Sequence, residues 1–424
     1  MLDLKFIREH PDLVRAGADA KGIAIHLEEV LTLDEQRRRS IQVVEVLKAT
    51  RNAVSAQVGR IKKEGGDAAP LIAEMESVKN QIQLIDSQLS EIEQKLEHHL
   101  LSIPNIPHPL VPIGRTPDEN KEISRWGDLP EVDFPLKPHW ELTEKFEIID
   151  FERGAKVTGA GFPFYVGKGA VLERALINLF LDQAGRRGYT EIAPPVVVNE
   201  ASARGTGQLP DKEDLMYVVE RDNMYMIPTA EVPVSNFLRD ETLQEKDLPV
   251  KYSAYSLCFR REAGSYGKDV RGLNRLHQFD KVELVKFVHP ESSYDELESL
   301  RDDAEHLLQL LGLPYRVLLM CTGDMGFTQS KKYDLEVWAP GQKKWLEVSS
   351  CSNFEAFQAR RMNLRYRPAN GGKPEFVHTL NGSGLALPRV VAALILLIEH
   401  YQTPEGKIII PKVLHPYTKF EVIG

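Results

Sequence analysis

One stretch of the chain combines residue types that suit the binding of a phosphate-bearing substrate. Arg260, Arg261 and Glu262 are followed by a polar, glycine-rich segment, 263–275, that carries Arg271. Charged groups on an otherwise apolar strand are costly unless they are paired or face a ligand. Two interpretations follow: a structural Arg–Glu salt bridge, or a site for a substrate that has both phosphates and an ammonium group.

The residues after this segment extend the pattern. Phe279 is a candidate for stacking on a flat ring, and Glu283 is expected to share a strand face with the apolar Val285. Because successive strand residues point to opposite faces, Arg260 and Glu262 are also expected on one face. The hypothesis of a ligand site therefore places acidic and basic groups on the same hairpin.

Two further segments carry groups of the same kind. Glu347 to Ser350 is expected to end a strand with a carboxylate and hydroxyls, which are hard oxygen ligands of the kind Mg²⁺ prefers. Asn381 to Gly384 is expected to turn from a strand into a helix. Pro388 is tolerated only in the first turn of that helix, which places Arg389 beside it. Each segment alone is typical of ordinary structural positions, but together with the charged hairpin they indicate a site.

The elements that must position these residues are mainly strands. Segments 252–262 and 276–288 alternate apolar and polar residues and flank the glycine-rich segment, which predicts a long antiparallel hairpin. Further strands are expected over 345–350 and 376–380. An amphipathic helix over 170–187 precedes them. This order predicts an α+β fold, a mainly antiparallel sheet flanked by helices.

One expected strand, 189–198, contains the pair Pro194-Pro195. Two consecutive prolines cannot both sit in a central ladder, because neither has a backbone N–H to donate. This strand is therefore predicted at an edge of the sheet or at an interface.

The N-terminal part has a different pattern, a heptad repeat in two runs. Residues 65–70, with two glycines and a proline, separate the runs, which predicts an antiparallel two-helix coiled-coil arm about 50 Å long. A dimerisation coiled coil is the alternative. The downstream run is Leu71, Met75, Val78, Ile82, Ile85, Leu89, Ile92 and Leu96; the upstream run is Val30, Leu33, Val44, Leu47, Val54, Val58 and Ile61, with Arg37, Ser40 and Arg51 also at seam positions.

Basic residues on the arm could contact phosphates, although a solvated face of mixed charge is the alternative for each. They are Arg51, Arg60, Lys62, Lys63 and Lys79. After the arm, the proline density of 103–118 predicts a stiff linker. We therefore expect an N-terminal arm over 1–102, a linker over 103–118 and a second domain over 119–424.

Composition limits the function classes. The 424 residues are 42% apolar and 27% charged, which is typical of a soluble globular protein, and no apolar stretch reaches the length of a membrane span. Met1 to Asp12 resembles no targeting signal, so we expect a cytoplasmic protein. The three cysteines lie far apart, so no structural zinc is expected. With a net charge of −9, nucleic acid would have to bind through a local basic patch.

These motifs resemble those of a known family. The sequence from Phe259 to Glu262 is similar to motif 2 of class II aminoacyl-tRNA synthetases, Gly384 to Arg389 to motif 3, and Gly188 to Pro195 to motif 1. More narrowly, Thr229-Ala230-Glu231 and the motif HTLNGSG at 378–384 resemble the seryl-tRNA synthetases, as do the N-terminal arm and linker. The resemblance covers essentially the whole chain.

The resemblance implies a reaction in which ATP and L-serine form seryl-adenylate and the seryl group passes to the 3′ end of tRNA. Arg260 would contact the α-phosphate and the serine carboxylate, Arg389 the far phosphates, and Arg271 either the phosphates or the tRNA end. Arg260, Arg389 and Glu283 would be the catalytic residues. The residues implied for ATP are Arg260, Arg261, Glu262, Arg271, Phe279, Glu347, Val348, Ser349, Ser350 and Arg389, with Mg²⁺ on Glu347 and Ser350.

The amino acid and tRNA sites are implied in the same way. Serine would be held by Thr229, Glu231, Arg260, Glu283, Thr379, Asn381 and Ser383. The arm would grip tRNA(Ser), with tRNA(Sec) as a second candidate acceptor, and motif 1 implies a homodimer. Two alternatives are a synthetase paralogue with another acceptor and a non-catalytic tRNA-binding protein. The first generally lacks the arm, and the second should have lost its ATP-contacting residues.

Overall fold

The computed structural model describes residues 1–262, 276–386 and 397–424. Its chain divides into two compact units, one formed by Leu2–Asp19 and Ile23–Pro104 and the other by Met1, Ala20–Gly22 and Asn105–Gly424. Arg271, Arg389 and most of the helix expected after Pro388 lie outside the described residues; residues 397–400 are described and are helical. Within the described ranges, no helix is both long and apolar enough to cross a membrane.

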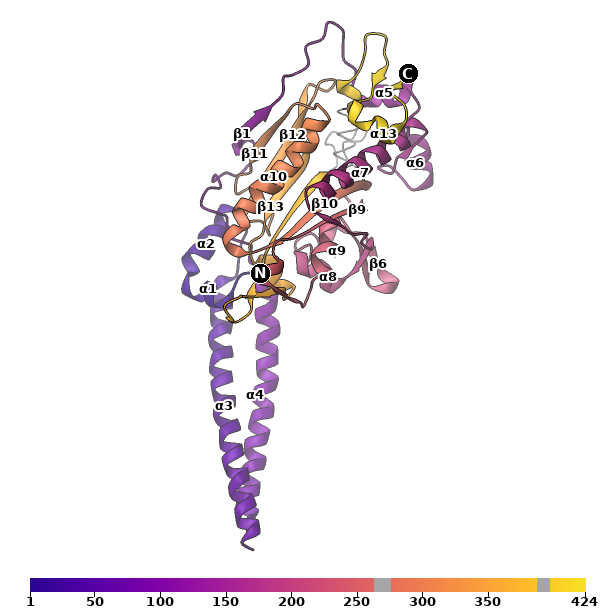
Figure 1. Cartoon of the computed structure of the whole chain (residues 1–424). Helices are drawn as coiled ribbons and strands as arrows, with labels where there is room; N and C mark the ends of the chain where they lie inside the picture. Colours follow the sequence, from indigo (N-terminus) through magenta and orange to yellow (C-terminus); the bar gives the residue numbers. More distant parts are fainter. Residues whose placement is uncertain (263–275, 387–396) are drawn as a thin grey trace. The chain divides into compact units, whose positions relative to one another are not determined.

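The first unit contains the predicted helical hairpin (Figure 1). Two short helices, α1 (Leu4–Glu9) and α2 (Pro11–Ala20), precede the long helices α3 (Leu27–Lys63) and α4 (Ala69–Leu101). Gly65, with φ of 73°, lies just beyond the end of α3, and Pro70 lies in the first turn of α4. A left-handed glycine after one helix and a proline at the start of the next are the breaks that the sequence predicted there.

The heptad seam explains how α3 and α4 pack. Every seam position of both runs is buried or half-buried, including the polar Arg37, Ser40 and Arg51. Arg37 Nε donates to Glu93 Oε1 on α4 at 2.9 Å, so a polar residue in the seam is satisfied across the hairpin. The Arg37–Glu93 hydrogen bond and the loop together fix the register of α3 against α4. Residues equally far from the loop therefore lie side by side.

The second unit is built on one large, mainly antiparallel sheet. The strand order is β1-β11-β12-β13-β16-β10-β9-β4, and only β4 and β9 run parallel. This confirms the α+β fold class. The strands are β1 (Lys121–Trp126), β11 (Tyr315–Leu319), β12 (Lys331–Ala339), β13 (Lys344–Asn353), β16 (His378–Ala386), β10 (Gln278–Val288), β9 (Val250–Phe259) and β4 (Thr190–Glu191).

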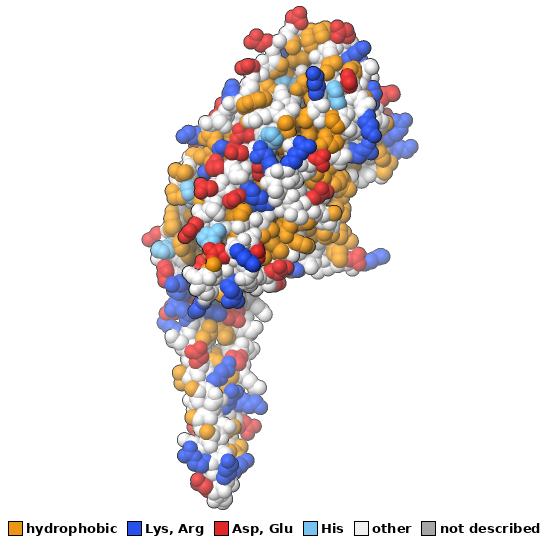
Figure 2. All heavy atoms as spheres, in the orientation of Figure 1, with side chains coloured by type: hydrophobic (Ala, Val, Ile, Leu, Met, Phe, Trp, Pro, Cys, Tyr) orange, Lys and Arg blue, Asp and Glu red, His pale blue; other side chains and the backbone are white. Residues whose placement is uncertain are grey.

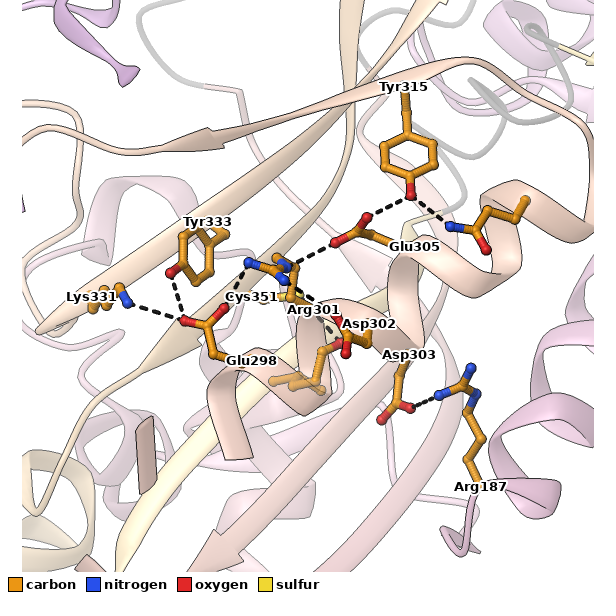
Figure 3. Close-up of polar contacts among 12 residues, drawn as sticks. Arg187, Glu298, Arg301, Asp302, Asp303, Glu305, Tyr315, Lys331, Tyr333 and Cys351 are labelled. Atoms are coloured by element: carbon orange, nitrogen blue, oxygen red, sulfur yellow. Dashed lines mark hydrogen bonds and ion pairs between the residues drawn. The ribbon is translucent and has the colours of Figure 1, made fainter. Parts of the chain in front are cut away.

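Helices α7 (Lys168–Arg186) and α10 (Ser293–Leu310) cover one face of this sheet with a continuous apolar core. Polar contacts hold α10 in place (Figure 3). Arg301 pairs with Glu298 at 2.7 Å and with Glu305 at 2.8 Å, and these carboxylates accept hydrogen bonds from Tyr333 and Tyr315 on the sheet. The network therefore joins α10 to β11 and β12.

The opposite face of the sheet carries α9 (Glu231–Asn236) and α11 (Phe357–Arg361), which pack on Val285 and Phe287 of β10. Among the described residues, the other helices of this unit with printed bounds are α5 (His139–Lys145), α6 (Phe151–Val157), α8 (Glu200–Thr206) and α13 (His415–Thr418), and residues 397–400 are also helical. Turns of 3₁₀ helix lie at Pro117–Glu119, Glu213–Leu215, Glu220–Asp222, Glu245–Asp247, Pro290–Ser292 and Lys412–Leu414. Two small sheets have two strands each: β2 (Ile149–Asp150) with β3 (Phe164–Tyr165), and β17 (Ile408–Ile409) with β18 (Val422–Ile423). Two others have three strands each: β5 (Val197–Asn199), β7 (Met224–Met226) and β6 (Val218–Val219) form one, and β15 (Glu375–Phe376), β14 (Arg365–Arg367) and β8 (Thr242–Gln244) form the other.

The prediction of one continuous strand over 189–198 is wrong, but its predicted place at an edge of the sheet is confirmed for the first part. The segment forms two short strands in different sheets: β4 at the edge of the large sheet, and β5 in a three-stranded sheet. The prolines at 194 and 195 lie between them. Because neither can donate a ladder hydrogen bond, they end the first strand and let the chain change sheets.

Candidate active site

The predicted hairpin is confirmed as β9 and β10, which pair along their whole length from Phe259–Gln278 to Val250–Phe287. The prediction that Arg260 and Glu262 share one face of a strand is wrong, because β9 ends at Phe259. Glu262 has a φ of 49°, a left-handed conformation outside strand geometry. Both side chains nevertheless line the same cavity, from irregular backbone beyond the end of the strand.

Strand β13 was expected to end at Ser350, and this is wrong: it continues to Asn353. A bulge explains how Glu347 and Ser350 still reach one site. Ser349 lies opposite Leu335 and Glu347 opposite Glu336, so Val348 is one extra residue in the ladder. Three positions apart, Glu347 and Ser350 would point to opposite faces of a regular strand; the extra residue brings them to the same face.

The turn expected at Asn381–Gly384 is also wrong, because these residues lie within β16. The two glycines serve packing. A Cβ on Gly382 would lie 3.0 Å from Cys351 Sγ and 3.1 Å from Leu300 Cγ, and one on Gly384 would lie 3.3 Å from Leu284 Cγ. The helix-covered face therefore has no room for a side chain here, while the alternating polar residues of the motif point to the opposite face.

That opposite face has a cavity of about 460 Å³. Seven of the predicted site residues line it: Thr229, Glu231, Arg260, Glu262, Glu347, Ser350 and Asn381. They come from β13, β16 and segments around α9 and the end of β9, which lie far apart in the sequence. A polar cavity with converging charges of both signs is the usual form of a small-molecule site.

Three lysines of the cavity were missed by sequence reasoning: Lys212, Lys281 and Lys332. One of them had a usable signal: Lys281 is two residues from both Phe279 and Glu283 on the same strand. Lys332 lies opposite Ser352, another lining residue, but this pairing is seen only in the folded sheet. Lys212 precedes a 3₁₀ turn and shows no periodic signal. Burial lowers its pKa, and the nearby Glu231 carboxylate opposes that effect.

Other predicted residues do not line the cavity. Arg261 is exposed, and its Nη1 donates to Asp214 O at 3.3 Å. Six residues are buried behind the cavity wall: Phe279, Glu283, Val348, Ser349, Thr379 and Ser383. Phe279 is 3% exposed and lies under the Arg260 guanidinium, 5.1 Å from the ring centroid. Val348 is part of the apolar core, and Ser349 Oγ donates to Ser383 O at 2.7 Å.

Glu283 is the most deeply buried of the predicted charged residues, at 1% exposure. Lys281 forms an ion pair with its carboxylate, and Thr229 Oγ1 donates to its Oε2 at 2.9 Å. The same hydroxyl accepts from Lys281 Nζ at 2.9 Å and from the Glu231 N–H at 3.2 Å. A hydroxyl can donate one hydrogen bond and accept two, so the hydrogen-bonding positions of Thr229 Oγ1 are all used within the protein. Burial raises the pKa of Glu283, and the Lys281 charge opposes that rise.

Asn381 is in the opposite situation. It is 7% exposed and lines the cavity, and its Nδ2 has no hydrogen-bond partner among the described residues. A buried donor without a partner costs about 1–3 kcal/mol. An oxygen of a bound ligand would remove this cost.

His378, at the start of β16, predicts how stability responds to acid. Burial lowers its pKa to about 4, with the charge of His289 acting in the same direction. In the unfolded chain the ring takes up a proton near pH 6.5, so the free energy of unfolding should fall as the pH drops from about 6.5 to about 4, by up to ~3 kcal/mol.

His378→Gln should be less sensitive to acid over this range, since the amide cannot titrate. Urea unfolding at several pH values measures the difference between the two proteins. Equal pH slopes would contradict this assignment.

Comparison with known proteins decides the family. Residues 1–107 match the model of the seryl-tRNA synthetase N-terminal domain, and residues 217–400 match the class II core domain of the tRNA synthetases for G, H, P, S and T. A serine–tRNA ligase of Salinibacter ruber is 55% identical over 428 residues, covering 100% of this chain and 99% of its own length. The chain belongs to the seryl-tRNA synthetase family. It is therefore an aminoacyl-tRNA synthetase, a ligase.

Other members of the seryl-tRNA synthetase family agree in sequence and in fold. A serine–tRNA ligase of Carboxydothermus hydrogenoformans is 53% identical and covers 98% of both chains. A crystal structure of a seryl-tRNA synthetase from Pyrococcus horikoshii, complexed with ATP, superposes with a TM-score of 0.92 at 37% identity, covering 100% of this chain and 99% of that one. The resemblance of the sequence to this family is thus confirmed over the full length.

Proposed function

We propose that this chain joins L-serine to ATP as seryl-adenylate in the cavity on the large sheet and then transfers the seryl group to the 3′-terminal adenosine of tRNA(Ser). The observation that carries the proposal is the convergence of Arg260, Glu231, Glu347 and Asn381 on one cavity in a chain of this family. No strong general base is required, because the serine carboxylate is already ionised at neutral pH.

What the reaction does require is that two anions be held close together and in line. A carboxylate that attacks an α-phosphate needs fixed cations to offset the repulsion and geometry that aligns the reacting atoms. Arg260 has the planar fork that binds carboxylate and phosphate oxygens with two parallel hydrogen bonds. Lys212, Lys281 and Lys332 add positive charge to the same cavity. In the proposal Arg389 binds the far phosphates, and Arg271 binds either the phosphates or the tRNA end.

Magnesium would bind with the ATP phosphates. Mg²⁺ takes few protein ligands and keeps positions for water and phosphate oxygens. The carboxylate of Glu347 and the hydroxyl of Ser350, which the bulge brings to one face, fit this demand. Among the described residues no group of three or more His, Cys, Asp or Glu side chains could form a metal site. In the proposal the ion neutralises phosphate charge, while Arg260 orients the α-phosphate.

Serine would be selected by polar groups of defined role. Glu231 takes the ammonium, and the unpartnered Asn381 Nδ2 donates to an oxygen of the amino acid. Thr229 acts through its neighbours, since its hydroxyl is already saturated. A site that hydrogen-bonds a substrate hydroxyl rejects the analogue lacking it, because its polar groups are then left unpaired. Glu283, Thr379 and Ser383 would support this arrangement from behind the wall.

The remaining proposals rest on the family. We propose an arm over 1–102 that binds tRNA, a linker over 103–118 and a catalytic domain over 119–424, acting as a cytoplasmic homodimer. The division of the chain between Pro104 and Asn105 supports the boundary. Figure 2 displays Lys and Arg gathered near the end of the hairpin, where Arg60, Lys62, Lys63 and Lys79 are exposed. Local basic residues suit phosphate contacts on an otherwise acidic protein. Charging of tRNA(Sec) belongs to the same proposal.

ATP–pyrophosphate exchange, with the amino acids tested singly and no tRNA present, tests the activation step. We expect exchange with serine and with no other amino acid at comparable efficiency. Comparable exchange with alanine or glycine would refute the serine assignment. Absence of exchange with any amino acid would favour a non-catalytic tRNA-binding protein, and transfer of serine to a carrier protein instead of tRNA would favour a paralogue.

A further inference from the structure

A buried glutamine that is not among the predicted site residues forms hydrogen bonds with two of them. Gln358, on α11, is 1% exposed. Its Nε2 donates to Glu231 Oε1 at 2.7 Å and to the backbone oxygen of Thr206 at 3.1 Å. Its Oε1 accepts from Thr379 Oγ1 at 2.8 Å. A single amide therefore connects α9, β16 and the end of α8.

The partners fix which way the amide points. The Thr206 carbonyl and the Glu231 carboxylate can only accept, so both need the NH₂ end of Gln358. The Thr379 hydroxyl donates to the other end. If the amide were rotated by half a turn, its oxygen would face two acceptors, and both contacts would become repulsive. The orientation is thus set by three separate elements of the fold.

This arrangement leaves Glu231 with one oxygen held and the rest of its carboxylate at the cavity. The side chain is 9% exposed and lines the cavity. A free glutamate side chain would lose rotamer freedom when it bound a substrate, and one already held by a charge-assisted hydrogen bond loses less. The acidic group meant for an ammonium is therefore oriented before the ligand arrives.

We infer that Gln358 is a positioning residue for the amino acid substrate: it holds the Glu231 carboxylate in the orientation that binds the α-ammonium. The inference rests on the proposed function of the cavity. It assigns the role to a residue that touches neither ATP nor serine. Removal of this hydrogen bond should therefore raise KM for serine and leave KM for ATP unchanged.

Two substitutions test this in the full-length protein. Gln358→Met keeps the length of the side chain but cannot donate, and we expect KM for serine to rise roughly 10- to 100-fold, the effect of losing a hydrogen bond to a charged group. Gln358→Glu should give a similar defect that depends on pH. When protonated, the introduced carboxyl can donate to Glu231 as the amide did; when ionised, it repels it. The defect should therefore grow as the pH rises, while Gln358→Met shows a defect independent of pH.

The control is Gln309→Glu, the same change at a glutamine on α10 whose Nε2 donates to Tyr315 Oη at 2.9 Å outside the cavity. It should alter neither KM. If the wild-type protein shows no serine-dependent exchange, the proposed function fails and not the positioning role. If the wild type supports exchange but Gln358→Met raises KM for serine and KM for ATP equally, or changes neither, the inference is overturned. Should Gln358→Glu not fold, the change in KM for serine relative to the change in KM for ATP in Gln358→Met decides alone.

Discussion

Arg260→Lys should lower serine-dependent ATP–pyrophosphate exchange by about 100- to 1000-fold, the range for removing one preorganised donor that stabilises transition-state charge. The charge is kept, but the planar fork is lost, and an ammonium cannot bridge a carboxylate and a phosphate in the same way. In the structure the guanidinium is fixed from two sides. Its Nε donates to Pro228 O at 3.4 Å, and its Cζ lies 5.1 Å from the centroid of the Phe279 ring.

The loss of activity in Arg260→Lys should appear in kcat as well as in KM, because the guanidinium acts on the charge that develops during attack. Arg365→Lys provides a matched control, since Arg365 also lies over a phenylalanine, 4.0 Å from the centroid of Phe376, outside the cavity. It should leave exchange unchanged. If Arg260→Lys reduced exchange no more than the control did, Arg260 would be a structural residue stacked on Phe279, and the alternative of a buried salt-bridge position would regain support.

The fold could be predicted from the sequence wherever a pattern depends on local periodicity. The heptad runs place α3 and α4 and identify the buried seam, and alternation over 252–262 and 276–288 locates β9 and β10. Errors arose where tertiary packing overrides local preference. Asn381–Gly384 has the composition of a turn, yet it lies in a central strand, where a Cβ at Gly382 would crowd Leu300 of α10 and Cys351 of β13, and one at Gly384 would crowd Leu284 of β10.

The site shows the same limit. Glu347 and Ser350 were selected for their chemistry, but only the bulge at Val348, invisible in one sequence, puts them on one face. Gln358 was missed because its role comes from contacts with Glu231 and Thr379, which arrive from other elements. Lys281 was missed although its ion-pair partner Glu283 lies two residues away on the same strand. Chemical type can nominate residues that touch a substrate. The residues that orient them are found only once the chain is folded.

Shortening the arm should separate the two halves of the reaction. Because residues equally far from the hairpin loop lie side by side, deleting 49–81 and joining Lys48 to Ile82 with a short glycine-rich loop keeps the inner seam, including the Arg37–Glu93 hydrogen bond. We expect exchange without tRNA to be unchanged and charging of tRNA(Ser) to fall by roughly 100-fold or more, the scale expected when several cations that bind phosphates are removed.

A finer version of the experiment tests whether charge is the cause. Lys62→Gln combined with Lys63→Gln removes two exposed cations beside the loop, and Glu74→Gln removes an exposed anion from the partner helix. The lysine changes should weaken tRNA binding and reduce its dependence on salt by about one counterion for each lysine–phosphate pair removed, whereas the glutamate change should not weaken it. If the shortened protein charged tRNA normally, the hairpin would have another role, and the dimerisation coiled coil would become the better interpretation. If exchange fell together with charging, the deletion would have damaged the catalytic unit, and the independence of the arm would be wrong.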